Sequence, residues 1–167
     1  RSEQYDSLII ATGSRPVIPH LTGIDDLMGR SIFTLAGTEH LKKIIEQTFA
    51  SGRCAVIGGG AIGVEAASAL NKICSDVTLI EIKNQILPGI LDPDISDLAE
   101  NYLLNRGIRI RRGTTVSGFS GTECLKSILC GVEEIDADMA IIAAGSAPDV
   151  SLAADSGIDA SPSGIRT

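Results

Sequence analysis

Three glycines stand at the spacing Gly58-x-Gly60-x-x-Gly63, directly after the apolar run Cys54–Ile57 and before a run of small residues that begins at Ala61. Glycine is unfavourable in regular structure, so a cluster at this place needs a compensating reason. In such a pattern the first glycine permits a sharp turn, the second lets backbone approach a diphosphate, and the third lets helix and strand pack closely. The spacing therefore predicts a phosphate-binding turn.

The helix that follows would supply the electrostatic complement. Its first backbone N–H groups have no partner within the helix, and the positive end of its dipole would face a bound anion. A chain of net charge −7 could hold an anion through this local field. The acid expected about 20 residues after the first glycine, where it binds ribose hydroxyls, is Glu81.

Glu81 also bears on the choice of cofactor. A carboxylate there would repel a 2′-phosphate, which favours NADH over NADPH, although Lys83 two residues further on would weaken that repulsion. The alternative is that the glycines form only a tight turn and that Glu81 is a solvated strand end. The order of strand, glycines, helix, strand and acid favours the nucleotide.

The elements that must position this motif follow from the apolar pattern. We expect buried strands at Tyr5–Thr12, Cys54–Ile57, Asp76–Glu81, Ile108–Arg112 and Asp138–Ala144. Helices are expected from Thr38 to Gly52, from Ala61 to about Ile73, and from Pro93, after an Asp92 cap, to Gly107.

Two of these helices carry apolar stripes that we expect to be buried. The stripes are Leu41, Ile44, Ile45, Thr48 and Phe49 in the first helix, and Ile95, Leu98, Ala99, Tyr102 and Leu103 in the last. Residues 114–136 lack a helical period and are interpreted as a small antiparallel excursion. The fold class is therefore α/β: a Rossmann-like parallel sheet with flanking helices and a small antiparallel β excursion.

Composition argues against several other functions. Aromatic residues make up 3% of the chain and the net charge is negative, which disfavours a nucleic-acid partner. The longest apolar runs are far short of the roughly 20 residues that cross a membrane, and no signal peptide is visible, so we expect a cytoplasmic protein. The cysteines form no CxxC pair, and we interpret all four as reduced thiols with no metal site: Cys54, Cys74, Cys124 and Cys130.

We interpret two groups of charged residues as part of the surface and of helix ends rather than as binding sites. Arg106, Arg109, Arg111 and Arg112 form the one basic cluster, which we interpret as a solvated face. The nearby acids Asp92, Asp94 and Asp97 are interpreted as helix-capping and dipole-complementing groups rather than metal ligands.

Four motifs follow one another along the chain: YDSLIIATGSRPVIP, VIGGGAIGVEAASAL, VTLIE…ILPGILDPDI and ADMAIIAAGSAPD. In content and order they resemble those of the FAD-dependent pyridine nucleotide-disulfide oxidoreductases, a family that includes NADH oxidases, coenzyme A-disulfide reductases, and rubredoxin and nitrite reductases. The resemblance implies that residues 1–36 are the trailing segment of an FAD domain with a connector, that 37–147 are the NAD(H)-binding domain, and that 148–167 begin the returning FAD-domain segment.

The resemblance also implies a function. The parent enzyme would pass a hydride from NADH to FAD and on to a disulfide, oxygen or a redox protein, and would be a homodimer; the 167 residues alone would be inactive. A non-catalytic nucleotide-sensing module is the alternative.

Site residues follow from the same resemblance. Glu65 matches a helix glutamate near the flavin–nicotinamide contact, although it could simply face solvent, and Ala61 replaces an aromatic residue that gates nicotinamide access in many members. Gly145 and Pro148 match the turn that borders the nicotinamide. The expected NAD(H)-binding residues are Gly58, Gly59, Gly60, Ala61, Ile62, Gly63, Glu81, Ile82, Lys83 and Gly145.

Overall fold

The computed structural model describes residues 3–166, with the side chains of Glu39 and Ala50 left out. The chain divides into two compact units. One comprises residues 1–15 together with 146–167, and the other comprises residues 16–145. We describe each unit by itself.

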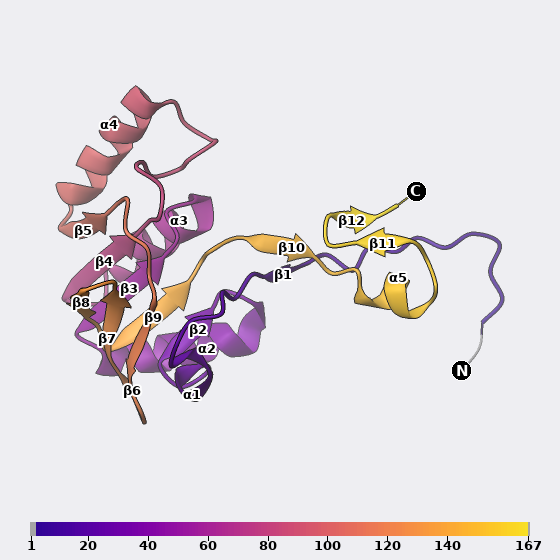
Figure 1. Cartoon of the computed structure of the whole chain (residues 1–167), viewed down its shortest axis with the longest axis horizontal. Helices are drawn as coiled ribbons and strands as arrows, with labels where there is room; N and C mark the ends of the chain where they lie inside the picture. The colour runs from indigo at the N-terminus through magenta and orange to yellow at the C-terminus, as the bar shows by residue number, and fades with distance from the viewer. Residues whose placement is uncertain (1–2, 167) are drawn as a thin grey trace. The chain divides into compact units, whose positions relative to one another are not determined.

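A five-stranded parallel sheet forms the centre of the unit 16–145 (Figure 1). Its strand order is β2-β9-β3-β4-β5, and each neighbouring pair is parallel. The strands are β2 (Ile32–Thr34), β3 (Arg53–Ile57), β4 (Asp76–Ile80), β5 (Ile108–Arg111) and β9 (Met139–Ile142). The β3, β4 and β9 strands are buried and appear as apolar runs, as is typical of strands covered on both faces. The edge strand β5 alternates isoleucine with exposed arginine and is predictable from that alternation.

Three helices cover one face of this sheet: α2 (Gly37–Ala50), α3 (Ala61–Leu70) and α4 (Pro93–Leu104). Each helix contributes buried residues to a shared core cluster, among them Ile44 of α2, Ala67 of α3 and Leu103 of α4. On the sheet side, this cluster contains Val56 of β3 and Leu79 of β4. The α3 helix crosses from β3 to β4, as the predicted βαβ unit requires.

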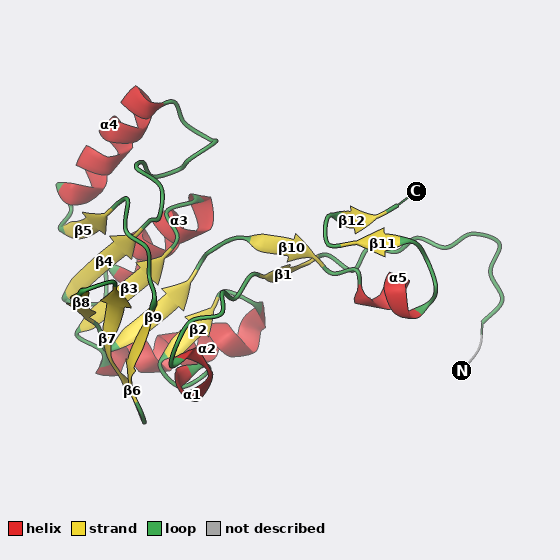
Figure 2. Cartoon of the chain, in the orientation of Figure 1, coloured by secondary structure: helices red, strands yellow, loops and turns green. Residues whose placement is uncertain are grey.

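The opposite face of the sheet is covered by a short helix, α1 (Ile24–Leu27), and a three-stranded antiparallel sheet (Figure 2). That sheet consists of β6 (Gly118–Gly121), β7 (Leu125–Cys130) and β8 (Glu133–Asp136). Phe119 and Ile128 pack with Ala55 and Ile142 of the parallel sheet in a second core cluster. The predicted α/β class and the antiparallel excursion are both confirmed.

The predicted helical stripes are too wide. In α2, Ile44 and Thr48 are buried, whereas Leu41, Ile45 and Phe49 are 47–79% exposed. Ile45 and Phe49 each follow a buried residue, so they lie about 100° around the helix from it and turn away from the sheet. Leu41 lies on the same side as Ile44 and Thr48 but near the start of the helix, and the structure gives no such reason for its exposure.

The same holds in α4. Leu103 is buried and Ala99 is partly buried, but Ile95, Leu98 and Tyr102 are 46–65% exposed. Helix boundaries were predicted unevenly. The α2 helix begins at Gly37, with Ala36 rather than Thr38 as its N-cap, and α3 ends at Leu70 rather than about Ile73, whereas the start of α4 is confirmed. Asp92 is the N-cap residue and Pro93 takes the first helical position, as expected.

The other unit contains short elements. They are β1 (Ser14–Pro16) paired with β10 (Ser146–Pro148), the helix α5 (Ser151–Asp155), and an antiparallel pair, β11 (Ala160–Ser161) and β12 (Gly164–Ile165). The prediction of a buried strand at 5–12 is wrong for this chain. Tyr5, Leu8 and Ile9 are 59–89% exposed, because an apolar run becomes a strand only where a neighbouring strand pairs with its backbone.

Two cysteines depart from the prediction of reduced thiols. Cys54 in β3 and Cys74, just after α3, form a disulfide with their Cα atoms 6.5 Å apart. Both of these cysteines are buried. Cys124 and Cys130 form no disulfide; Cys124 is exposed and Cys130 is partly buried. The two bonded cysteines are 20 residues apart, so their contact could not be recognised from sequence. It arises because α3 returns the chain to the edge of the sheet at which β3 begins.

Candidate functional site

The three glycines of the motif have distinct steric roles. Gly58 has a φ of 112°, and a Cβ there would collide with the backbone of Ala143. A Cβ on Gly63 would collide with the Gly58 carbonyl oxygen, so the helix can approach the turn only at glycine. Nothing lies within 4 Å of the Cβ position of Gly60, which leaves space beside the backbone at that point.

The N-terminus of α3 carries unpartnered donors. Gly60 is the N-cap residue and no side chain caps the helix. The first intrahelical bond runs from Val64 N–H to the Gly60 carbonyl oxygen at 3.0 Å, so the N–H groups of Ala61, Ile62 and Gly63 precede the bonded ladder. This arrangement provides an anion site made of backbone.

Glu81 lies directly beneath the turn. Only 6% of the residue is exposed, and its two carboxylate oxygens accept bonds from different N–H groups. Oε2 accepts from Gly59 N–H at 2.5 Å, and Oε1 accepts from Lys83 N–H at 2.8 Å. The alternative of a solvated strand end is therefore wrong for Glu81. The same carboxylate explains why residue 59, between two glycines of the motif, is also a glycine: a Cβ on Gly59 would lie 3.0 Å from Glu81.

A cavity of about 420 Å³ opens at the carboxyl ends of β3, β4 and β9. This is where parallel α/β sheets bind ligands, and the size is typical of small-molecule sites. Six of the residues predicted from sequence line it: Gly58, Gly60, Glu81, Ile82, Lys83 and Gly145.

The other predicted residues lie outside the cavity lining. Gly59 and Gly63 are buried within the turn, and Ala61 and Ile62 are exposed at the start of α3. Glu65 is exposed on α3 and does not line the cavity.

Nine lining residues were not predicted as site residues. Four lie at or near the ends of predicted strands: Ile57, Ile80, Ala143 and Ala144. The other five are Pro19, Leu21, Thr114, Thr115 and Val116. Thr114, Thr115 and Val116 come shortly after the end of β5 at Arg111, and their position near the carboxyl end of a sheet strand could have identified them. Pro19 and Leu21 come from the proline-containing connector, where no local pattern indicates a ligand.

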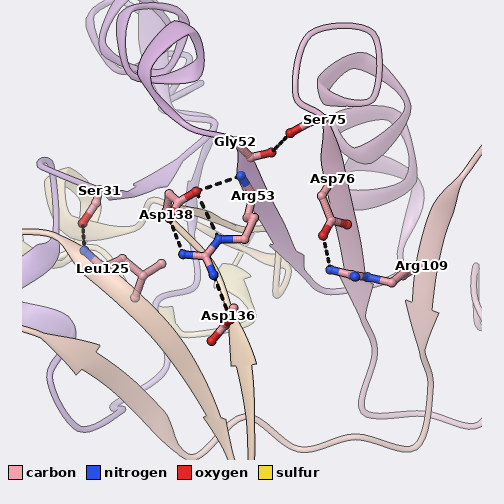
Figure 3. Close-up of polar contacts among 9 residues, drawn as sticks. All are labelled: Ser31, Gly52, Arg53, Ser75, Asp76, Arg109, Leu125, Asp136 and Asp138. Carbon is pink, nitrogen blue, oxygen red and sulfur yellow. Dashed lines mark hydrogen bonds and ion pairs between the residues drawn. The ribbon is translucent and has the colours of Figure 1, made fainter.

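The amino ends of the same strands carry charged side chains that pair with one another (Figure 3). Arg53, at the start of β3, donates from Nη2 to Asp138 Oδ1 at 2.7 Å and from Nη1 to Asp136 Oδ2 at 2.8 Å. These contacts hold the pKa of the Asp138 carboxyl below its ordinary value and raise the pKa of the Arg53 guanidinium. Arg109 pairs with Asp76 at the start of β4.

Acids also pair with two more residues of the basic cluster. Arg111 pairs with Glu133, and Arg112 lies 3.0 Å from Asp97 and 3.1 Å from Glu100. The fourth residue, Arg106, stacks on the ring of Tyr102, 3.6 Å from its centroid. Three of the four arginines of the predicted solvated face are therefore in partly exposed ion pairs. Within residues 3–166, no group of three or more His, Cys, Asp or Glu side chains is arranged to hold a metal ion. No helix in this range is both long and apolar enough to cross a membrane.

The parallel sheet, the glycine turn and the buried acid below it define a Rossmann-like domain of the nucleotide-binding class. The particular family follows from comparison with known proteins. The pyridine nucleotide-disulphide oxidoreductase family model matches residues 1–167, and the chain belongs to that family. The predicted family is confirmed.

Individual relatives agree with this assignment. The chain is 32% identical over 163 residues to the NADH oxidase of Streptococcus pneumoniae, covering 90% of this chain and 36% of the relative. Among solved structures, the water-forming NADH oxidase from Lactobacillus brevis bound to NADH matches 96% of this chain and 35% of its own, at 30% identity and a TM-score of 0.84.

A NAD-dependent persulfide reductase from A. fulgidus matches 94% of this chain and 29% of its own, at 32% identity and a TM-score of 0.86. The chain thus spans about a third of the length of the relatives that it matches.

Proposed function

We propose that this chain is the NADH-binding domain of a flavin-dependent oxidoreductase, whose parent passes a hydride from NADH to FAD and on to a disulfide, oxygen or a redox protein. The observation that carries the proposal is the backbone-lined turn at Gly58–Gly63 with Glu81 buried beneath it. Relatives that are NADH oxidases support it. No observation favours a non-catalytic nucleotide-sensing module.

The diphosphate of the cofactor would bind to the first N–H groups of α3. Ala61, Ile62 and Gly63 offer these donors, and Gly60 leaves the approach open. The positive end of the α3 dipole adds an attraction that the negative charge of the whole chain does not cancel, because the field is local. The backbone thus provides the charge complement.

Glu81 would fix the ribose. Each carboxylate oxygen accepts one backbone N–H and keeps a further lone pair for a ribose hydroxyl. A 2′-phosphate would meet this buried negative charge, so NADH is favoured. Exposed Lys83 reduces the penalty, which makes the expected preference smaller than for an acid without a neighbouring cation.

The nicotinamide end would lie toward Gly145, where the chain leaves β9. The small side chain of Ala61 leaves access there open. Glu65 would act near the flavin only when the FAD domain of the parent is present. When FAD is bound in the parent, it accepts the hydride; the residues of this chain bind and orient the donor.

The domain boundaries are part of this proposal. We assign 37–147 to NAD(H) binding, and 1–36 and 148–167 to segments that join the FAD domain. A homodimeric parent and a cytoplasmic location are further predictions. The 167 residues alone should bind NADH only weakly and should not turn it over.

Calorimetric titration with NADH and NADPH tests the proposal. The wild-type chain should bind NADH more tightly, and Glu81→Ala should weaken NADH binding by about tenfold while changing NADPH binding less. Glu133→Ala is the matched control, because Glu133 is exposed on β8 and does not line the cavity. Tighter binding of NADPH to the wild type would contradict the choice of cofactor, and no binding of either would contradict the function.

A further inference from the structure

We propose that Ser96, a residue of α4 outside the cavity lining, positions the Gly60 N–H for the cofactor diphosphate through a row of hydrogen-bonded peptides. The inference rests on the proposed function, since it names how the same site is held in shape. The row runs from Ser96 to the peptide that joins Ile86 to Leu87, and from there to the peptide that joins Gly59 to Gly60.

The first link is a buried hydroxyl. Ser96 is fully buried, and its Oγ donates to the Ile86 carbonyl oxygen at 2.7 Å. A serine within a helix often bonds to a carbonyl of its own preceding turn. Here the hydroxyl instead reaches out of the helix to the loop that precedes it. The side chain of Ile86 is also fully buried. The loop is therefore fixed at Ile86 both by the hydrogen bond to its carbonyl oxygen and by the packing of its side chain.

The second link uses the other end of the same peptide. The N–H of Leu87 donates to the Gly59 carbonyl oxygen at 2.7 Å. Leu87 has a φ of 50° and is the one non-glycine residue with positive φ in the described part of the chain. Such a conformation is unfavourable for a leucine and persists where surrounding contacts determine it. The N–H groups of Ile90 and Leu91 both donate to the Leu87 carbonyl oxygen at 3.1 Å.

The third link reaches the turn itself. The Gly59–Gly60 peptide is trans, so its N–H points opposite to its carbonyl group. Because the Gly59 carbonyl faces Leu87, the Gly60 N–H is directed away from the loop. The Gly59 N–H is held separately by Glu81 at 2.5 Å. Both backbone groups of Gly59 are therefore fixed before any ligand binds, and this fixes the neighbouring N–H of Gly60.

The order of the donors matters as well as their positions. The Ser96 hydroxyl, the Leu87 N–H and the Gly60 N–H point the same way along the row, and hydrogen bonds in such chains polarise one another. The last donor in the row lines the cavity, beside the N-terminus of α3. Ser96 thus acts on the ligand through two peptides, as a positioning residue.

Ser96→Ala tests the row, with Ser127→Ala as the matched control. Ser127 is also buried and its hydroxyl also donates a bond of 2.7 Å, to Glu134, but it lies in β7, outside the row. We expect Ser96→Ala to weaken the binding of NADH and of ADP-ribose by about fivefold and to leave adenosine, which has no phosphate, unchanged. Ser127→Ala should change none of the three.

Two further variants separate the N–H from the side chain at Leu87. Leu87→Pro removes the N–H and cannot adopt the positive φ, so NADH binding should fall more than tenfold. Leu87→Gly keeps the N–H and tolerates the conformation, so binding should stay within about twofold of the wild type. Thermal unfolding of each variant shows that a folded chain is being compared.

The amide proton shift of Gly60 in ligand-free protein tests the row without the cofactor. Ser96→Ala should move it and Ser127→Ala should not. Equal losses of NADH and adenosine in Ser96→Ala, or an unchanged Gly60 shift, would overturn the inference. If the wild type does not bind NADH, the proposed function fails, and with it the role toward the diphosphate, while the Gly60 shift still decides whether the row exists.

Discussion

The two ends of the parallel sheet use polar groups in opposite ways. At the carboxyl ends of β3 and β4, the turn at Gly58–Gly63 offers backbone N–H donors beside a cavity whose charged lining residues are Glu81 and Lys83. At the amino ends, charged side chains satisfy one another: Arg53 with Asp138, and Arg109 with Asp76 (Figure 3).

The difference separates binding from stability. Side-chain ion pairs at one edge leave little net charge for a ligand, because Arg53 and Arg109 already lie against carboxylates. Backbone donors at the other edge have no protein partner and face open space, which suits a ligand that brings its own acceptors. Substitutions at the two edges should therefore have different consequences, and the following predictions test this from the largest effect to the smallest.

Gly63→Ala should have the largest effect. The added Cβ would collide with the Gly58 carbonyl oxygen. This oxygen belongs to the backbone, so it cannot move aside as the end of a flexible side chain could. We expect a loss of about 3 kcal/mol or more in the free energy of unfolding, measured by urea titration. Gly60→Ala is the control at the same turn: with nothing within 4 Å of its Cβ position, it should retain stability and lose NADH affinity.

The disulfide should have the next largest effect, and it lies at the amino edge. Replacing Cys54 and Cys74 together by alanine should lower the free energy of unfolding by about 3 kcal/mol, because the cross-link closes a loop with a separation of 20 residues. NADH affinity should change little. The free residues Cys124 and Cys130 are the controls, and an equal loss from their double replacement would contradict the assignment.

Asp138→Asn should have a smaller effect that depends on pH. Its carboxyl has a pKa below the ordinary 3.8, mainly because Arg53 donates to it, so the ionised form stabilises the folded chain above that pH. This contribution is lost as the pH falls through the lowered pKa. At pH 7 the variant should lose about 1 kcal/mol, since the pair is partly exposed. Its unfolding free energy should then fall less steeply than that of the wild type below about pH 4.

Arg109→Gln should have the smallest effect. The side chain is 58% exposed in its pair with Asp76, and exposed pairs contribute little. We expect a loss of about 0.5 kcal/mol at low ionic strength that diminishes in 1 M salt, by urea unfolding at both conditions. A loss as large as that of Gly63→Ala would show that the amino edge is not merely a set of surface pairs.

Much of the binding edge could be predicted from sequence because its residues are local. Gly58, Gly60 and Gly63 lie within six residues of one another, and Glu81 directly follows a strand with a clear apolar run. What Glu81 contacts could not be predicted: the bonds to Gly59 and Lys83 depend on how β4 lies beside the turn. Equally, the short β2 strand gives no pattern long enough to recognise.

The other wrong predictions, of which residues are buried or in contact, share one cause. Whether a residue is buried depends on which element of the fold packs against it. Phe49 continues a helical stripe and is nevertheless exposed, and Ile9 belongs to an apolar run that pairs with no strand. Cys54 and Cys74 look unrelated until α3 returns the chain. Periodicity identifies which residues could be buried; only the arrangement of neighbouring layers decides which are.

The link between Cys54 and Cys74 encloses the whole glycine turn and α3 in a covalent ring. A protease that nicks the backbone anywhere inside this ring would leave a single species on a non-reducing gel. The two pieces would part only when a thiol reductant is added.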